Sequence, residues 1–137
     1  FTHFGKAVPW WVALAHPGGA QMGHMRRVYE SVDWWKLEPR PGAVTAAGNL
    51  TERESKQVLA KAFEDRLFLI YIPSDIEPDS ELTLQGTSNR LRYNMTWFNP
   101  RDGKFEQIPR RLNGSPGKLL LPSRPDDHDW VLVMSAD

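Results

Sequence analysis

Hydrophobic and polar residues alternate along residues 91–98. One side of this segment carries Leu91, Tyr93, Met95 and Trp97, and the other carries Arg92, Asn94 and Thr96. A two-residue period is typical of a strand with one buried face and one solvent-facing face. The turn-forming run Asn-Pro-Arg-Asp-Gly follows at residues 99–103, and residues 104–108 return along the first strand. The pattern therefore predicts a β-hairpin, around which we expect the rest of the chain to be organised.

Further segments have strand-like patterns and are separated by turn signals. They are residues 44–47, 57–63, 66–72, 81–84, 118–121 and 129–134. Glu64 and Asp65 predict a tight turn, and residues 48–53, 73–80 and 109–117 predict polar or turn-rich connections. Residues 66–72 are apolar on both faces, which predicts a central strand covered from both sides. Seven or eight short strands at regular spacing predict a mainly β fold, an antiparallel β-sandwich preceded by a short helical segment.

The opening third has a different periodicity. Pro9 opens the apolar segment PWWVALA, which predicts a short helix that the His-Pro-Gly-Gly run at residues 16–19 ends. A second helix is predicted from about Ala20 to Val32. Its apolar side carries Met22, Met25, Val28 or Tyr29, and Val32, and its polar side carries Gln21, His24, Arg27 and Glu30. The Pro- and Gly-rich residues 38–42 predict a boundary between a helical segment, residues 1–41, and a β-sandwich domain, residues 42–137.

Four of the six tryptophans lie in this opening third: Trp10, Trp11, Trp34 and Trp35. Two short helices cannot enclose that much aromatic surface between themselves. The helices must therefore pack on the β portion, on a partner, or on a further domain.

Composition excludes some classes of function. The 137 residues suffice for one domain with a sizeable core. Seventeen basic and seventeen acidic residues balance, which removes the electrostatic argument for a nucleic acid or membrane partner. The absence of cysteine excludes a disulfide scaffold and thiol catalysis. The sequence begins as if already inside a fold, so we expect a processed protein or a piece of a longer one.

Candidate chemical groups are few. The run Asp126-Asp127-His128-Asp129 is the best metal candidate, but its spacing lacks the pattern of a calcium loop, and a solvated turn is the favoured interpretation. The histidines have no zinc-site spacing, although His3 and His16 flank the first tryptophan pair. We therefore expect no metal and no cofactor.

Glycoside hydrolysis needs two carboxylates held across a bond in environments that separate their pKa values. Glu64 and Asp65 sit in a turn, and Asp75, Glu77 and Asp79 sit in a loop, so neither group fits. We expect the chain not to be an enzyme on its own. The aromatic residues offer sugar-stacking surfaces instead, with Phe98 and Tyr71 as the strand residues that could project outward, although a core position is favoured for each.

The opening third resembles the closing helix of the apiosidase-like glycoside hydrolase barrels of bacteria in two stretches, PGGAQMGHMRRVYES and DWWKLEP. The stretches WFNPRDGKF and DWVLVM resemble the β-sandwich that follows such a barrel, a module known as the "putative collagen-binding domain of a collagenase". The motifs keep the family's order and span nearly the whole chain.

The resemblance implies the end of a barrel followed by a C-terminal sandwich. The acid and base of such a barrel lie at the ends of earlier strands, so no catalytic residue is carried over. His3, Trp10 and Trp11 lie where the resemblance places a substrate cleft, and they are the candidate ligand-binding residues.

Two functions from different classes remain. In the first, the sandwich is a non-catalytic accessory domain that supports the catalytic barrel of an extracellular or periplasmic protein. The alternative is a carbohydrate- or collagen-binding module. An exposed row of aromatic side chains across one sheet would favour binding, whereas aromatic residues at the junction with the helices would favour structural support. We favour the supporting role.

Overall fold

The computed structural model describes residues 9–46, 58–113 and 118–137. Two helices and a 3₁₀ turn precede the strands: α1 (Trp10–Ala13), α2 (Pro17–Glu30) and η1 (Trp34–Lys36). The strands are β1 (Glu38–Pro39), β2 (Val44–Ala46), β3 (Leu59–Phe63), β4 (Leu67–Ile72), β5 (Leu82–Leu84), β6 (Arg92–Asn99), β7 (Lys104–Asn113), β8 (Leu119–Leu120) and β9 (Trp130–Ala136). None of the described helices is long and apolar enough to span a bilayer.

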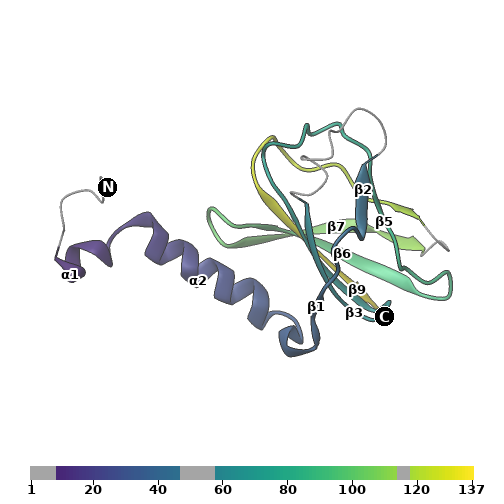
Figure 1. Cartoon of the computed structure of the whole chain (residues 1–137), viewed down its shortest axis with the longest axis horizontal. Helices are drawn as coiled ribbons and strands as arrows, with labels where there is room; N and C mark the ends of the chain where they lie inside the picture. The colour runs from purple at the N-terminus through teal and green to yellow at the C-terminus, as the bar shows by residue number, and fades with distance from the viewer. Residues whose placement is uncertain (1–8, 47–57, 114–117) are drawn as a thin grey trace.

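The strands form two antiparallel sheets, and this confirms the predicted sandwich. The larger sheet has the order β1-β3-β4-β9-β6-β7, and the smaller has the order β2-β5-β8 (Figure 1). The core lies between them and includes Phe68, Ile70, Tyr93, Trp97 and Leu132. The apolar strand β4 lies inside the larger sheet between β3 and β9, as its composition predicts.

The predicted hairpin is confirmed as β6 and β7. Tyr93, Met95 and Trp97 are buried on the core side, and the backbone N–H of Gly103 donates to Asn99 O at 2.8 Å to close the turn. The return strand is longer than predicted, because residues 109–113 continue β7 where a polar connection was expected. Pro109 is tolerated because β7 is an edge strand and the register shifts beside it, between Tyr93 and Met95.

The described part of the chain contains nine strands rather than seven or eight. The additional strand is β1, in the segment interpreted as a boundary, where Glu38 pairs with Ala62 and Pro39 with Lys61 of β3. The predicted turn at Glu64 and Asp65 is present, with Glu64 at φ 51°. The predicted loop at residues 48–53 and the first residue of the strand predicted at residues 57–63 lie outside the described residues.

Helix α2 begins at Pro17, three residues before the predicted start. The run at residues 16–19 lies after the end of the first helix, as predicted, but its Pro-Gly-Gly part belongs to α2. Proline is well suited to the first helical position, where its missing N–H costs nothing. The helix ends at Glu30 rather than Val32. The first helix is confirmed, with Pro9 as the residue before its first turn.

Arg124 ties together the two long connections at one end of the sandwich. Its buried guanidinium donates to Pro73 O at 2.7 Å, to His128 O at 2.9 Å and to Ile76 O. Ile76 is itself buried in the core. The sequence pattern gives no signal for this role, because a lone arginine in a polar stretch is usually exposed.

We expect Arg124→Met to lower the free energy of unfolding by about 2–4 kcal/mol, because it leaves three carbonyl oxygens without their donor. Urea denaturation measures this change. Arg92→Met, at an exposed position in β6, is the matched control and should change stability by less than about 0.5 kcal/mol. Equal effects of the two substitutions would contradict the role assigned to Arg124.

Candidate functional site

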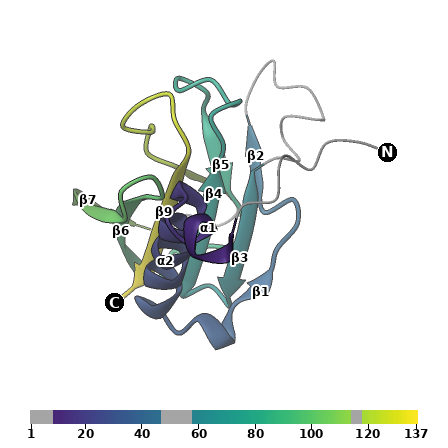
Figure 2. The ribbon, with the colours of Figure 1, turned by 90° about the vertical axis from the view of Figure 1, so that its left-hand side faces the viewer.

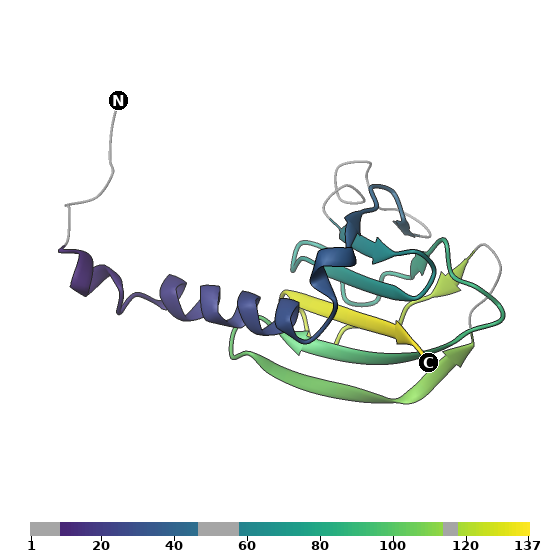
Figure 3. The same ribbon diagram turned by 90° about the horizontal axis from the view of Figure 1, so that it is seen from below.

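Helix α2 packs against the outer face of the larger sheet, opposite the core (Figure 3). Val28, at 4% exposure, contacts Leu69 of β4 and Phe98 of β6. Tyr29, Leu37, Val131 and Val133 surround this contact. Phe98 was one of two strand aromatics considered as an outward platform. It does lie on the outer face, but the helix covers it, so it belongs to a small second core.

Two residues on the polar side of α2 contact the hairpin turn. His24 Nδ1 donates to Pro100 O at 3.0 Å, and Arg27 Nη1 donates to Gly103 O at 2.9 Å. The sequence pattern places both residues on the polar side of the helix and predicts no partner for them. Arg27 is exposed and His24 is partly buried, and the turn offers carbonyl oxygens that satisfy such side chains as well as water does. We call these two hydrogen bonds the helix–hairpin clamp.

Two features of the structure favour glycine at position 103, one in the turn and one in the clamp. Its φ of +71° lies in the left-handed region that favours glycine. A Cβ atom at this position would also lie 2.7 Å from His24 Cδ2, inside van der Waals contact. The glycine of the predicted turn therefore fits both the turn and the approach of the helix.

The sandwich leaves the four tryptophans of the opening third largely exposed. Trp10, Trp11, Trp34 and Trp35 are 70%, 62%, 52% and 65% exposed. Each adjacent pair makes an edge-to-face contact, with ring centroids 5.8 Å apart in α1 and 6.2 Å apart in η1. Helix α1 and the first turns of α2 project away from the sheets (Figure 1), and Figure 2 looks along this projection. The described part of the sandwich therefore leaves these side chains largely exposed, and a covering by a partner or a further domain stays a prediction.

The candidate ligand-binding residues are placed only in part. Trp10 and Trp11 lie together on the exposed helix α1, whereas His3 lies outside the described residues. His16 is exposed at the position before α2. Whether these residues bind a ligand stays a prediction.

A groove of about 440 Å³ runs between α2 and the outer face of the larger sheet. Its walls are mainly apolar and include Met25, Val28, Tyr29, Leu59, Leu69 and Tyr71. This groove was not predicted, because its residues come from one helix and four strands that are distant in sequence.

The polar end of the groove is built around Asp129. Its Oδ2 accepts from the Tyr71 hydroxyl at 3.1 Å, and its Oδ1 accepts from the Ser74 N–H at 2.7 Å. Burial, and then the negative charge of Asp129, raise the pKa of Tyr71, so the phenol keeps its proton and donates. Among the described residues, Asp129 is the one carboxylate that lines this groove.

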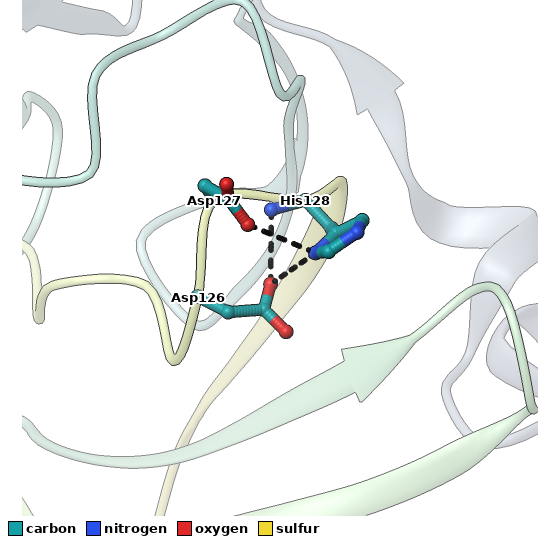
Figure 4. A group of neighbouring side chains, drawn as sticks. All are labelled: Asp126, Asp127 and His128. Atoms are coloured by element: carbon teal, nitrogen blue, oxygen red, sulfur yellow. Dashed lines mark hydrogen bonds and ion pairs between the residues drawn. The ribbon is translucent and has the colours of Figure 1, made fainter.

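The acidic run before β9 forms the turn that the sequence favours. Asp126 Oδ1 accepts from the His128 N–H at 2.9 Å and from Trp130 Nε1 at 2.7 Å, and its Oδ2 accepts from Arg101 at 3.3 Å. His128 Nδ1 lies 3.3 Å from Asp126 and 3.1 Å from Asp127 (Figure 4). The indole hydrogen bond is the main cause that lowers the pKa of Asp126. Local donors thus already use both oxygens of Asp126, and all three side chains are exposed.

Comparison with known proteins gives a family and a fold. The family model described as "Putative collagen-binding domain of a collagenase" matches residues 48–135. A solved structure described as "Glycoside hydrolase" is 20% identical with a TM-score of 0.71, and the match covers 96% of this chain and 28% of that one. A glycoside hydrolase family 5 structure from Bacteroides vulgatus is 21% identical with a TM-score of 0.65, and the match covers 93% of this chain and 26% of that one. At such identities these two structures show a shared fold alone. No curated protein matches.

We expect Gly103→Ala to destabilise the chain more than Gly42→Ala does. Gly42 has a similar φ of +74°, but nothing lies near its Cβ position, so its substitution measures the backbone strain alone, about 1 kcal/mol. The alanine at position 103 must also displace His24 from Pro100, which adds about 1 kcal/mol. Urea denaturation of both variants measures the difference. In a His24→Ala background the excess at position 103 should vanish, and its persistence would contradict the clamp.

We expect Asp126→Asn to weaken the dependence of stability on acid. The pKa of this carboxyl is lower in the folded chain than its ordinary value of 3.8, so its contribution is present above that value. The contribution is lost as pH falls through the folded pKa. Thermal unfolding between pH 2 and pH 6 measures the effect, with Asp127→Asn as the control. An unchanged acid profile for Asp126→Asn would disprove the assigned contribution.

Proposed function

This chain belongs to the family described as "Putative collagen-binding domain of a collagenase", and from that premise we propose that it is a non-catalytic accessory sandwich of a larger glycoside-hydrolase-like protein. In this proposal the sandwich follows the catalytic barrel and stabilises it. The larger protein is extracellular or periplasmic. The two solved structures support the proposal that this chain is part of a larger protein, since it spans only 28% and 26% of their lengths.

The single observation that carries the proposal is the exposure of the four tryptophans in α1 and η1. Burying a large aromatic side chain contributes roughly 2–3 kcal/mol, so leaving four exposed forgoes a large part of the stability of a small domain. Large exposed apolar surfaces mark interaction sites. A neighbouring catalytic domain would cover them and gain that free energy.

The alternative is a module that binds carbohydrate or collagen, and the family's description favours it. The described strands, however, carry no exposed row of aromatic side chains. Their exposed large hydrophobic residues are Leu59, Phe105 and Leu120, of which one is aromatic. The tryptophans lie on the helical segment instead. This distribution favours the supporting role.

The test compares the longer protein, produced from the gene with its flanking coding sequence, with a version that ends at residue 41. We expect both to hydrolyse the same glycoside, and we expect the shorter version to lose activity faster on heating, because its sandwich is missing. The isolated chain should show no hydrolysis. Flanking sequence that encodes no hydrolase domain, or equal heat inactivation of the two versions, would overturn the proposal.

Native gels that contain pectic or hemicellulosic polysaccharides, with a soluble-collagen binding assay, test the alternative in parallel. The accessory role predicts no selective retardation of the isolated chain. Selective retardation by one glycan, or binding to collagen, together with unchanged heat stability of the shortened protein would make the sandwich a binding module.

A further inference from the structure

We propose that Asp102 and Gly103 form a site of aspartate isomerisation, and that the helix–hairpin clamp protects this site. In the first step the backbone nitrogen of Gly103 attacks Cγ of Asp102, an N–C bond forms, and water leaves. In the second step water opens the resulting succinimide ring, and opening at the backbone carbonyl gives isoaspartate. The water released first is taken up again, so no other reactant is needed. The reaction takes place within the chain and does not depend on the proposed function.

The sequence at the hairpin turn favours this reaction. Asp-Gly occurs once in the chain, at residues 102–103. A glycine after aspartate has no side chain to hinder the attack, and its backbone reaches conformations that other residues avoid. Asp102 is exposed in the turn, so water reaches its carboxyl group. The local chemistry is therefore that of a reactive site.

The folded turn holds both reacting groups in other hydrogen bonds. The Gly103 N–H donates to Asn99 O at 2.8 Å. Asp102 Oδ1 accepts from the Lys104 N–H at 3.0 Å, and Oδ2 lies 3.7 Å from Lys104 Nζ. The attack requires the nitrogen to leave Asn99 and the carboxyl group to leave Lys104. Isomerisation therefore proceeds from the small fraction of chains in which the turn is open.

The clamp opposes this opening from outside the turn. Arg27 Nη1 donates to Gly103 O at 2.9 Å, and Gly103 is buried. The His24 ring lies so close to Gly103 that a Cβ atom there would be 2.7 Å from His24 Cδ2. Gly103 cannot move toward the helix without displacing this ring, and it cannot turn away without losing Arg27. Docked α2 thus lowers the rate at which Asp102 reacts.

The product weakens the clamp in return. Isoaspartate adds one carbon atom to the backbone between positions 102 and 103. The added atom changes the spacing between Asn99 O and the Gly103 N–H, which closes the turn in the unmodified chain. It also moves Gly103 O away from Arg27. A chain that has reacted therefore holds α2 less firmly than one that has not.

The test follows isoaspartate during prolonged incubation of the chain at neutral pH. Cleavage after glutamate releases residues 82–106, in which Asp102 is the one aspartate, and chromatography with electron-transfer fragmentation measures its isomer. Arg27→Met should raise the rate about fivefold, the factor that corresponds to one ordinary hydrogen bond. The matched control is Arg26→Met, because the neighbouring Arg26 bonds to Glu30 and not to the turn. It should leave the rate unchanged.

Two further comparisons separate local protection from overall stability. In urea, wild type and both arginine variants should react at one common rate, faster than the folded wild type. Leu84→Val, a cavity in the smaller sheet far from the turn in sequence, lowers overall stability and should not accelerate the reaction while the chain stays folded. In an aged sample, trypsin should cleave after Arg27 sooner in chains that carry isoaspartate.

Four outcomes would overturn the inference. The first is an equal rate for Arg27→Met and Arg26→Met. The second is a folded wild type that reacts as fast as the chain in urea. The third is an acceleration by Leu84→Val as large as that by Arg27→Met, because the reaction would then follow global unfolding. The fourth is equal trypsin cleavage after Arg27 in modified and unmodified chains.

Discussion

The arrangement of the whole chain depends on the contact between Val28 and the outer face of the larger sheet. Leu69 and Phe98 form the other side of this contact, and they are neighbours in space only because β4, β9 and β6 pair in register. One apolar side chain fixes where the helix lies, and the helix–hairpin clamp fixes its rotation. Without this contact, the helical segment would be held to the sandwich by the helix–hairpin clamp and by the connection through η1 and β1.

The two faces of strand β6 in the hairpin pack into two different hydrophobic clusters. Tyr93, Met95 and Trp97 fill the space between the sheets, and Phe98 fills the space under α2. The Tyr93 hydroxyl accepts from the Ser88 N–H at 3.0 Å and donates to Asp65 O at 2.6 Å, so its polar end is satisfied while its ring is buried. A strand that is buried on both faces over part of its length cannot slip in register without losing both contacts.

Sequence periodicity predicts the sandwich well because each strand's pattern is local. The alternating pattern at residues 91–98 predicts which face of that strand is buried. The apolar run of β4 likewise predicts that this strand lies inside a sheet. The clamp, the groove and Arg124 could not be predicted, since each depends on which distant carbonyl or strand lies opposite. His24 and Arg27 illustrate the limit, because a polar side chain has the same pattern whether its partner is water or the backbone of a turn. The sequence pattern predicts that the four tryptophans need a covering surface, but it contains no information on which surface covers them.

The short strand β1 has a consequence for where the chain can be divided. Residues 38–42 look like a linker, yet Glu38 and Pro39 cover the edge of β3. A polypeptide that begins after them would leave the backbone groups of β3 unpaired, beside the exposed Leu59. An open apolar edge is a template on which another copy can add a strand. By pairing with β3, Glu38 and Pro39 therefore protect the sandwich against the addition of a strand from another copy.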